Sequence, residues 1–500
     1  MRVTDNMIMN KTKYNINLNK VSVDKLNSQM TTQQKIEKAS EDPVIAMRSL
    51  RLSTDLSHMT QFVDNNIPDV ESWIDVTKTS LMNMNKVLTD IRQKCVAGAH
   101  DTLQPEDRNT IWKELTALSE QVYAEGNADY AGRTVFTGFR TNCQLVFTKD
   151  ERDTTYEITQ KFQESDIEHR RYYTKGSEVP TDASTQYTGT ISQEHNYDRL
   201  RLAYNGVESQ NEPTLKLFDQ TDPDNLVEVT NTANYRYYAS EQEWQDDTGV
   251  KSLGDDEIIV IRNTGEMILG KNISDTMKSN DYLAEINYVK KGFAKGDVKP
   301  EYYFDCKDVT DPQNPIEYTK EDQQITYTVA INTHITINTQ ASDVFSTDIA
   351  RDVEEMIDII NSAIVAHDKY DKITNMMKQS RYSDEVSQNN LKTYLDAAAK
   401  EVAYAEDNLQ KTYSQYITNF DGYQRDVNLA VTNLGSTQVR LSLIKTRVEN
   451  QKTTVNELKV KNDYRDLSDV ILDFYTANNA YQSSLTAAAQ VGRQSLLDYL

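Results

Sequence analysis

Cysteine is scarce in this chain of 500 residues, and its spacing excludes several classes of protein. Cys95, Cys143 and Cys306 are far apart and form no C-x-x-C pair, so neither a zinc ribbon nor a disulfide-stapled secreted fold is indicated. Proline is also rare, at nine residues, and no apolar run approaches the roughly 18 residues of a membrane span. The polar first residues lack the apolar core of a signal peptide, so we expect a soluble protein with no cleaved signal.

Signatures of catalysis and of metal binding are missing as well. There is no H-E-x-x-H, no glycine-rich phosphate loop and no G-x-S-x-G motif. The acidic residues around Pro223 lack the spacing of a calcium loop, and residues 168–171 are interpreted as a solvated charged loop. A net charge of −23 is unfavourable for binding nucleic acid or an anionic membrane. We therefore expect no enzymatic activity, no cofactor and no metal, and neither nucleic acid nor membrane as a partner.

What the sequence does contain is heptad periodicity. Over residues 434–458 the favoured positions step by three and four, which is typical of a helix that packs along a partner helix. A similar seam follows Asp42-Pro43, a favourable helix start. Because the two seams are alike in character, we expect them to pair within one chain. The predicted intramolecular coiled-coil seam consists of Val70, Ile74, Leu81, Leu88, Ile91, Leu441, Ile444, Val448, Val455 and Leu458.

The two outermost segments have weaker apolar stripes and opposite net charge. Residues 1–38 are net positive and residues 465–500 net negative, which favours their pairing. A helix as polar as residues 1–38 is marginal alone, so we expect it to be completed by contacts between subunits. The predicted assembly interface consists of Met7, Tyr14, Leu18, Val21, Leu467, Val470, Ile471, Phe474, Tyr481, Leu485, Leu496 and Leu497.

The middle of the chain changes to period-two patterns. Residues 258–261 and 267–269 flank Asn263-Thr264-Gly265, which predicts a hairpin, and residues 148–345 are predicted to be β-rich. The expected fold class is α + β and multidomain, with a long antiparallel helical coiled-coil rod formed by both chain ends and a β-rich insertion. We expect a terminal helical assembly module (1–42 and 463–500) and a helical rod domain with a short β segment (43–147 and 346–462). The outer insertion (148–345) is expected to form one or two domains.

Several local strings carry a resemblance to a known family. Ser40-Glu41-Asp42-Pro43 is similar to an S-x-D-D-P segment, and the last six residues are similar to S-L-L-D-F-L. Asn127, Gly132 and Phe136 stand at the spacing of an N-x-x-x-x-G-x-x-x-F-x-G run, which Gly138 completes. In this order the strings resemble the flagellin family, and within it the branch of hook–filament junction proteins.

The resemblance implies a structural component of the bacterial flagellum that joins hook to filament. Such a subunit is expected outside the cell, after type III export, and to assemble by packing of its terminal helices. The implied partners are other copies of the chain in a ring, hook-associated protein 1, filament flagellin, and an export chaperone that holds the C-terminal region. A filament flagellin is the alternative within the family. A stalked adhesin that binds glycan or host protein through the β insertion is the alternative from another class.

Overall fold

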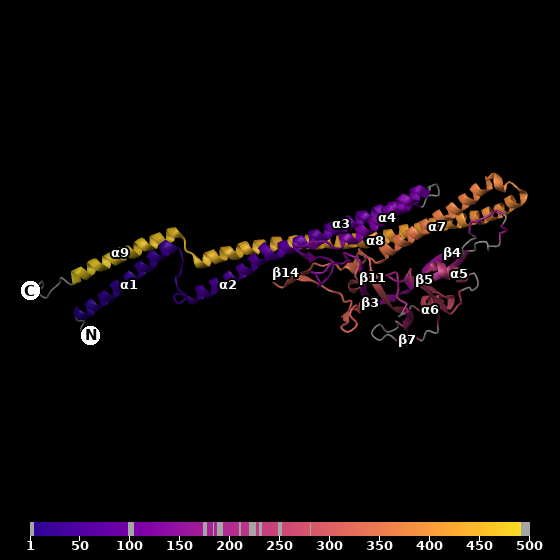
Figure 1. Cartoon of the computed structure of the whole chain (residues 1–500). Helices are drawn as coiled ribbons and strands as arrows, with labels where there is room; N and C mark the ends of the chain where they lie inside the picture. The colour runs from indigo at the N-terminus through magenta and orange to yellow at the C-terminus, as the bar shows by residue number, and fades with distance from the viewer. Residues whose placement is uncertain are drawn as a thin grey trace, which may run out of the picture. The chain divides into compact units, whose positions relative to one another are not determined.

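The chain is an α + β structure whose long helices come from both ends and whose strands come from the middle (Figure 1). This computed structural model describes residues 5–98, 105–173, 178–183, 185–187, 194–209, 212–219, 227–229, 233–248, 253–280 and 282–491. The predicted fold class, with helical ends and a β-rich centre, is confirmed. Two compact units are present: Met1–Glu71, Tyr327–Ile335 and Gln438–Leu500 form the first, and Ser72–Thr326 and Thr336–Thr437 form the second.

The N-terminal helices begin where capping chemistry favours them. Asp42 is the N-cap of α2, and its carboxylate accepts hydrogen bonds from the amides of Val44 and Ile45 at 3.0 and 3.1 Å. Proline at the first helical position needs no hydrogen bond of its own, so the start is doubly favourable. The helices of this part are α1 (Asp5–Thr32), α2 (Pro43–Gln61), α3 (Ile67–Gly98) and α4 (Pro105–Glu125).

A five-residue π-helix, Phe62–Asn66, joins α2 to α3. Its last residue stands two positions before Pro68, which has no amide hydrogen and cannot continue the regular hydrogen-bond ladder. The amide of Ile67 bonds instead to the carbonyl of Phe62. The proline therefore changes the helical hydrogen-bonding pattern here without ending the helical run.

The C-terminal half returns to helix as the sequence predicts. A single helix is expected over residues 384–462, and α8 occupies Glu385–Asp463. It is preceded by α7 (Asp348–Met377) and followed, after a three-residue break, by α9 (Leu467–Val491).

Among the described residues, the strands form two larger sheets and two two-stranded hairpins. The six-stranded sheet has the spatial order β13 (Ile316–Tyr318), β12 (Asp305–Asp308), β3 (Glu151–Phe162), β11 (Leu283–Phe293), β6 (Thr214–Asp219) and β7 (Val227–Val229). The five-stranded sheet has the order β4 (Glu168–Tyr173), β5 (Glu194–Arg201), β10 (Glu266–Leu269), β9 (Glu257–Ile261) and β8 (Asn234–Tyr238). The hairpins are β1 (Asp129–Tyr130) with β2 (Arg133–Thr134), and β14 (Thr326–Ala330) with β15 (Thr333–Thr336); the short helices α5 (Glu241–Thr248) and α6 (Lys271–Asn280) lie between strands in the sequence.

The hairpin predicted around Asn263-Thr264-Gly265 is confirmed. β9 and β10 pair antiparallel, with Glu266 opposite Ile261. Gly265 has φ +66°, and a Cβ there would lie 2.4 Å from the carbonyl oxygen of Tyr204. Only glycine meets both requirements, which explains the turn sequence.

Alternation along β5 places its two arginines on one face of the five-stranded sheet. Arg199 and Arg201 point to the same face because they are two residues apart. Glu168 on β4 is the cross-strand partner of Arg199, and Glu266 on β10 is that of Arg201. Cross-strand partners share a face, so opposite charges gather on this side of the sheet.

Candidate functional site: the paired terminal helices and a buried ionic cluster

A short clasp of backbone hydrogen bonds joins the end of α1 to the start of α9. The amide of Lys35 donates to the carbonyl of Asp463 at 2.8 Å, and the amide of Arg465 donates to the carbonyl of Gln33 at 2.9 Å. The Arg465 guanidinium also donates to Gln29 Oε1 at 3.2 Å. From this clasp the two helices run side by side (Figure 1). The clasp fixes their antiparallel order.

One face of α1 packs against α9, and we call the two rows of covered residues the inward seam. On both helices these residues recur in steps of four and three, the spacing of two helices that lie along each other. The inward seam consists of Thr12, Ile16, Asn19, Val23, Leu26 and Met30 on α1, and of Val470, Phe474, Ala477, Tyr481, Ser484 and Ala488 on α9.

A second apolar row follows the opposite face of α1, and we call it the outward stripe: Met7, Tyr14, Leu18 and Val21. These four side chains expose 55, 64, 51 and 66% of their surface. Tyr14, Leu18 and Val21 each stand two residues beyond a position of the inward seam, which is about 200° around a helix at 3.6 residues per turn. One helix therefore carries two apolar faces, and among the described residues only the inward one is covered.

The predicted assembly residues on α1 are exposed, whereas several of those on α9 are covered. Those at the N-terminus all lie on the outward stripe. On α9, Val470 is fully buried, and Ile471, Phe474 and Tyr481 are partly buried on the side toward α1. Leu467 and Leu485 expose 41 and 43% of their surface, and Leu496 and Leu497 lie outside the described residues. Their participation in contacts between subunits remains a prediction.

The predicted coiled-coil seam is buried over most of its length. Contacts in each compact unit show how the long helices meet. In the first unit, Lys445 pairs with Glu71 at 3.1 Å. In the second unit, the side-chain amide Nδ2 of Asn85 donates a hydrogen bond to Asn428 Oδ1 at 2.7 Å. The buried members are Val70, Ile74, Leu81, Leu88, Ile91, Leu441, Ile444 and Val448, while Val455 is partly buried.

Leu458 does not join the buried row. Half of its surface is exposed, at 50%, whereas Lys452 and Lys459 are partly covered. A strict heptad repeat assumes 3.5 residues per turn, but a straight α-helix has 3.6, so the covered face drifts along the sequence. By the end of α8 the covered positions have moved on by one residue, from Leu458 to Lys459. The aliphatic stem of a lysine can cover such a position while its ammonium reaches water.

Leu81→Ala is expected to lower the free energy of unfolding by about 2–5 kcal/mol, because it opens a cavity at a fully buried seam position. Met82→Ala is the matched control one residue on, where 56% of the side chain is exposed. The control is expected to change stability by less than about 0.5 kcal/mol. Urea unfolding followed by circular dichroism measures both. Equal effects would show that Leu81 is not part of a packed seam.

The second feature is a cluster of buried charges on the five-stranded sheet. Arg199, with 2% of its side chain exposed, pairs with Glu168 at 2.7 Å and also with Glu266 and Glu355. Arg170 lies 3.3 Å from Glu168 and 3.5 Å from Glu355. Each arginine thus touches several carboxylates. The charges of β4, β5 and β10 are neutralised by one another and by α7.

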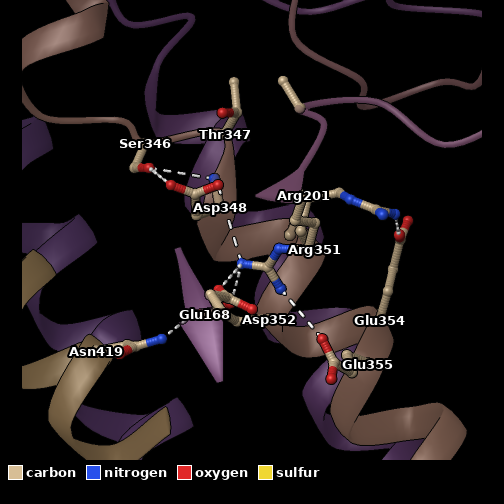
Figure 2. Close-up of polar contacts among 12 residues, drawn as sticks. Glu168, Arg201, Ser346, Thr347, Asp348, Arg351, Asp352, Glu354, Glu355 and Asn419 are labelled. Carbon is tan, nitrogen blue, oxygen red and sulfur yellow. Dashed lines mark hydrogen bonds and ion pairs between the residues drawn. The ribbon is translucent and has the colours of Figure 1, made fainter. Parts of the chain in front are cut away.

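Side chains from α7 and α8 complete the cluster. Figure 2 shows Asp348, Asp352 and Glu355 of α7 turned toward Arg201, which pairs with Asp352 and lies 3.4 Å from Glu355. Asp352 is fully buried and also accepts a hydrogen bond from Asn419 on α8 at 3.1 Å. The cluster therefore ties the sheet to both helices.

The interpretation of residues 168–171 as a solvated loop is wrong. They lie in β4, and Arg170 exposes only 6% of its surface. Glu168 and Arg170 are largely buried because they have charged partners on β5 and α7, which a single stretch of sequence does not show, whereas His169 is exposed. A signal was present in two separate places: Arg199 and Arg201 alternate on one strand, and Asp348, Asp352 and Glu355 recur on one helix face.

The arginines control the protonation of the cluster. Burial alone would raise the pKa of Glu168, but Arg199, Arg201 and Arg170 outweigh it and hold this pKa at about 2. Burial, acting against Arg201, raises the pKa of Asp352 above its ordinary value. Protonation of Glu168 therefore disfavours the folded state, whereas the folded state favours protonation of Asp352.

The lowered pKa of Glu168 predicts a pH dependence. A folded pKa of about 2 against an ordinary 4.5 means that the folded state favours the charged form, by about 3 kcal/mol. This contribution is complete above pH 4.5 and is lost as the pH falls through 2. Glu168→Gln removes that titration and is expected to flatten the fall in stability between pH 4.5 and 2, measured by urea unfolding at each pH. An unchanged profile in the variant would contradict the assignment.

The described residues contain no group of three or more His, Cys, Asp or Glu side chains arranged to hold a metal ion. Nor does any described helix combine the length and apolar character of a membrane span. Arg92 forms an ion pair with Asp421 of α8.

Comparison with known proteins finds similarity in the N-terminal helical part of the chain. Residues 3–141 match the model of the bacterial flagellin N-terminal helical region. The flagellar hook-associated protein 3 of Salmonella typhimurium is 22% identical over 142 residues, which are 28% of this chain. The matched region spans 44% of the length of that relative. Residues 3–141 therefore resemble the N-terminal helical region of bacterial flagellins, and the predicted resemblance to that family is confirmed.

Solved structures give a weaker likeness. The flagellar junction protein FlgL of Legionella pneumophila is 12% identical, with 84% of this chain and 100% of that chain covered and a TM-score of 0.31. FlgL of Xanthomonas campestris is 11% identical, with 81% and 99% covered and a TM-score of 0.25. Scores this low do not establish a shared arrangement.

Proposed function

We propose that this chain is a structural subunit of the bacterial flagellum that joins hook to filament. The observation that carries the proposal is the outward stripe on α1, an apolar row left exposed on a helix whose other face is already covered by α9. Exposed apolar surface of this kind marks a contact with another protein. The family match of residues 3–141 and the similarity to hook-associated protein 3 support flagellar neighbours as that contact.

The mechanism is packing. α1 and α9 pair through the inward seam, and the outward stripe then packs against neighbouring copies of the chain. Leu472 and Tyr475 add apolar surface on α9, where they expose 68 and 62%. Each new subunit covers the stripe of the one before it, and a closed ring leaves none exposed within the ring.

The proposed partners follow from this position. Hook-associated protein 1 would lie on the hook side of the ring and filament flagellin on the other side. The subunit would be exported by the flagellar route, with a chaperone covering its C-terminal apolar residues until assembly. In this role the ionic cluster holds the β region to α7 and α8 and performs no chemistry.

Deletion of the gene tests the proposal. Hooks are expected to persist while filament subunits appear in the culture medium, because the filament loses the surface on which it is built. Re-expression of the full chain is the control and restores filaments. Intact filaments in the deletion strain would contradict a junction role, and loss of filament protein from both cells and medium would favour a filament flagellin.

A further inference from the structure

A cavity of about 520 Å³ lies at one end of the five-stranded sheet. It exists because β10 is shorter than its neighbour: Leu269, its last residue, is opposite Asp198, whereas β5 continues back to Glu194. Residues 194–197 pair with β4 on one side only, according to the register of the described strands. His195, Asn196 and Tyr197 of this stretch line the cavity.

One wall of this cavity is aromatic. The rings of Tyr172 and His195 stack, with centroids 4.9 Å apart and planes inclined by 17°. The ring of Tyr172 also lies 4.5 Å from that of Trp244. Trp244 is 1% exposed and packs on Ile259, so the wall has a rigid backing. Its indole Nε1 is a buried donor with no acceptor among the described residues.

The opposite side is polar and held in place. The carboxylate of Asp198 accepts hydrogen bonds from Lys278 Nζ at 2.7 Å and Ser274 Oγ at 2.5 Å, and it lies 3.0 Å from His169 Nδ1. Asn196 and Lys271 stand on the exposed rim. Donors and acceptors of both charges therefore line the same cavity as the aromatic side chains.

We propose that this cavity binds carbohydrate, in the form of one or two pyranose rings. A pyranose has an apolar C–H face that stacks on aromatic rings and a rim of hydroxyl groups that both donate and accept hydrogen bonds. The cavity offers both kinds of surface, and its volume lies in the range of small-molecule sites. Lys271 and Lys278 are balanced by Asp198 and Asp255, which favours a neutral ligand over an anion.

The purified full-length chain is applied to an array of neutral and acidic oligosaccharides, and the strongest neutral binder is titrated by calorimetry. Binding is expected, and Asn196→Ala/Lys271→Ala is expected to weaken it at least tenfold. Both side chains are exposed at the rim, so the fold is preserved. Lys216→Ala, an exposed position on β6 of the other sheet, is the matched control and leaves the affinity unchanged.

Three results would overturn the proposal: no binding to any oligosaccharide, an affinity that the rim variant leaves unchanged, or binding confined to acidic glycans and inorganic phosphate. The site is independent of the junction role. The rim variant is therefore expected to restore filaments in the deletion strain whether or not sugar binds.

Discussion

Leu18→Asp/Val21→Asp is expected to abolish incorporation of the chain into the flagellum while leaving its fold intact. Both side chains are more than half exposed on the outward stripe, so the monomer loses no packing. In the assembled state a neighbour would enclose the new carboxylates, and an uncompensated buried charge costs about 3–5 kcal/mol, more than a hundredfold in affinity. The variant is expressed in the deletion strain, and its amount in sheared flagella is measured by immunoblot.

Two controls separate the faces of α1. Ser22→Asp lies at an exposed polar position between them and is expected to incorporate normally. Val23→Asp lies on the inward seam and is expected to lower the helix content of the monomer, measured by circular dichroism, because it places a charge between α1 and α9. Normal incorporation of Leu18→Asp/Val21→Asp would show that the outward stripe is not an assembly surface.

Arg199→Met is expected to destabilise the second compact unit by about 3–5 kcal/mol, because removal of one partner leaves buried charges uncompensated. Arg199 is the common partner of Glu168, Glu266 and Glu355, which retain 20, 11 and 19% side-chain exposure. Guanidinium unfolding followed by tryptophan fluorescence measures the effect, since Trp244 packs on the same sheet.

Lys161→Met is the matched control for this substitution. Lys161 also forms an ion pair, with Asp305 at 3.9 Å, but half of its side chain is exposed. Exposed pairs contribute less than about 1 kcal/mol, so the same change of residue is expected to have little effect. A cost for Arg199→Met as small as that of Lys161→Met would contradict the view that the cluster joins the sheet to α7.

The helices and the hairpin could be predicted because their signals are local. The N-cap at Asp42, the heptads of α8 and the Asn263-Thr264-Gly265 turn act over a few residues, and the structure has these elements where the sequence indicates them. Which of the two apolar faces of α1 packs against α9 could not be predicted from the sequence. A heptad pattern shows that a stripe exists, but not which of two stripes on α1 meets α9.

The ionic cluster and the aromatic cavity were missed for a related reason. Arg199 and Glu355 are 156 residues apart in the sequence, and their pairing depends on the packing of β5 against α7. Trp244 stands in a polar stretch and gives no sign that it backs a cavity. Both the ionic cluster and the aromatic cavity are formed by strands that pair over long distances in the sequence. The sequence contains all of these residues but does not show which of them contact one another.

Crosslinking in assembled flagella tests the central claim most directly. Cys95 and Cys306 are buried, so in a Cys143→Ser background an introduced cysteine is the accessible thiol among the described residues. A photoactivatable crosslinker attached through a maleimide to Leu18→Cys is expected to join each chain covalently to a neighbouring copy, because the outward stripe meets neighbouring copies. Val23→Cys, on the inward seam, is expected to remain monomeric. Dimers from Val23→Cys and none from Leu18→Cys would contradict the assignment of the two faces and the assembly role built on it.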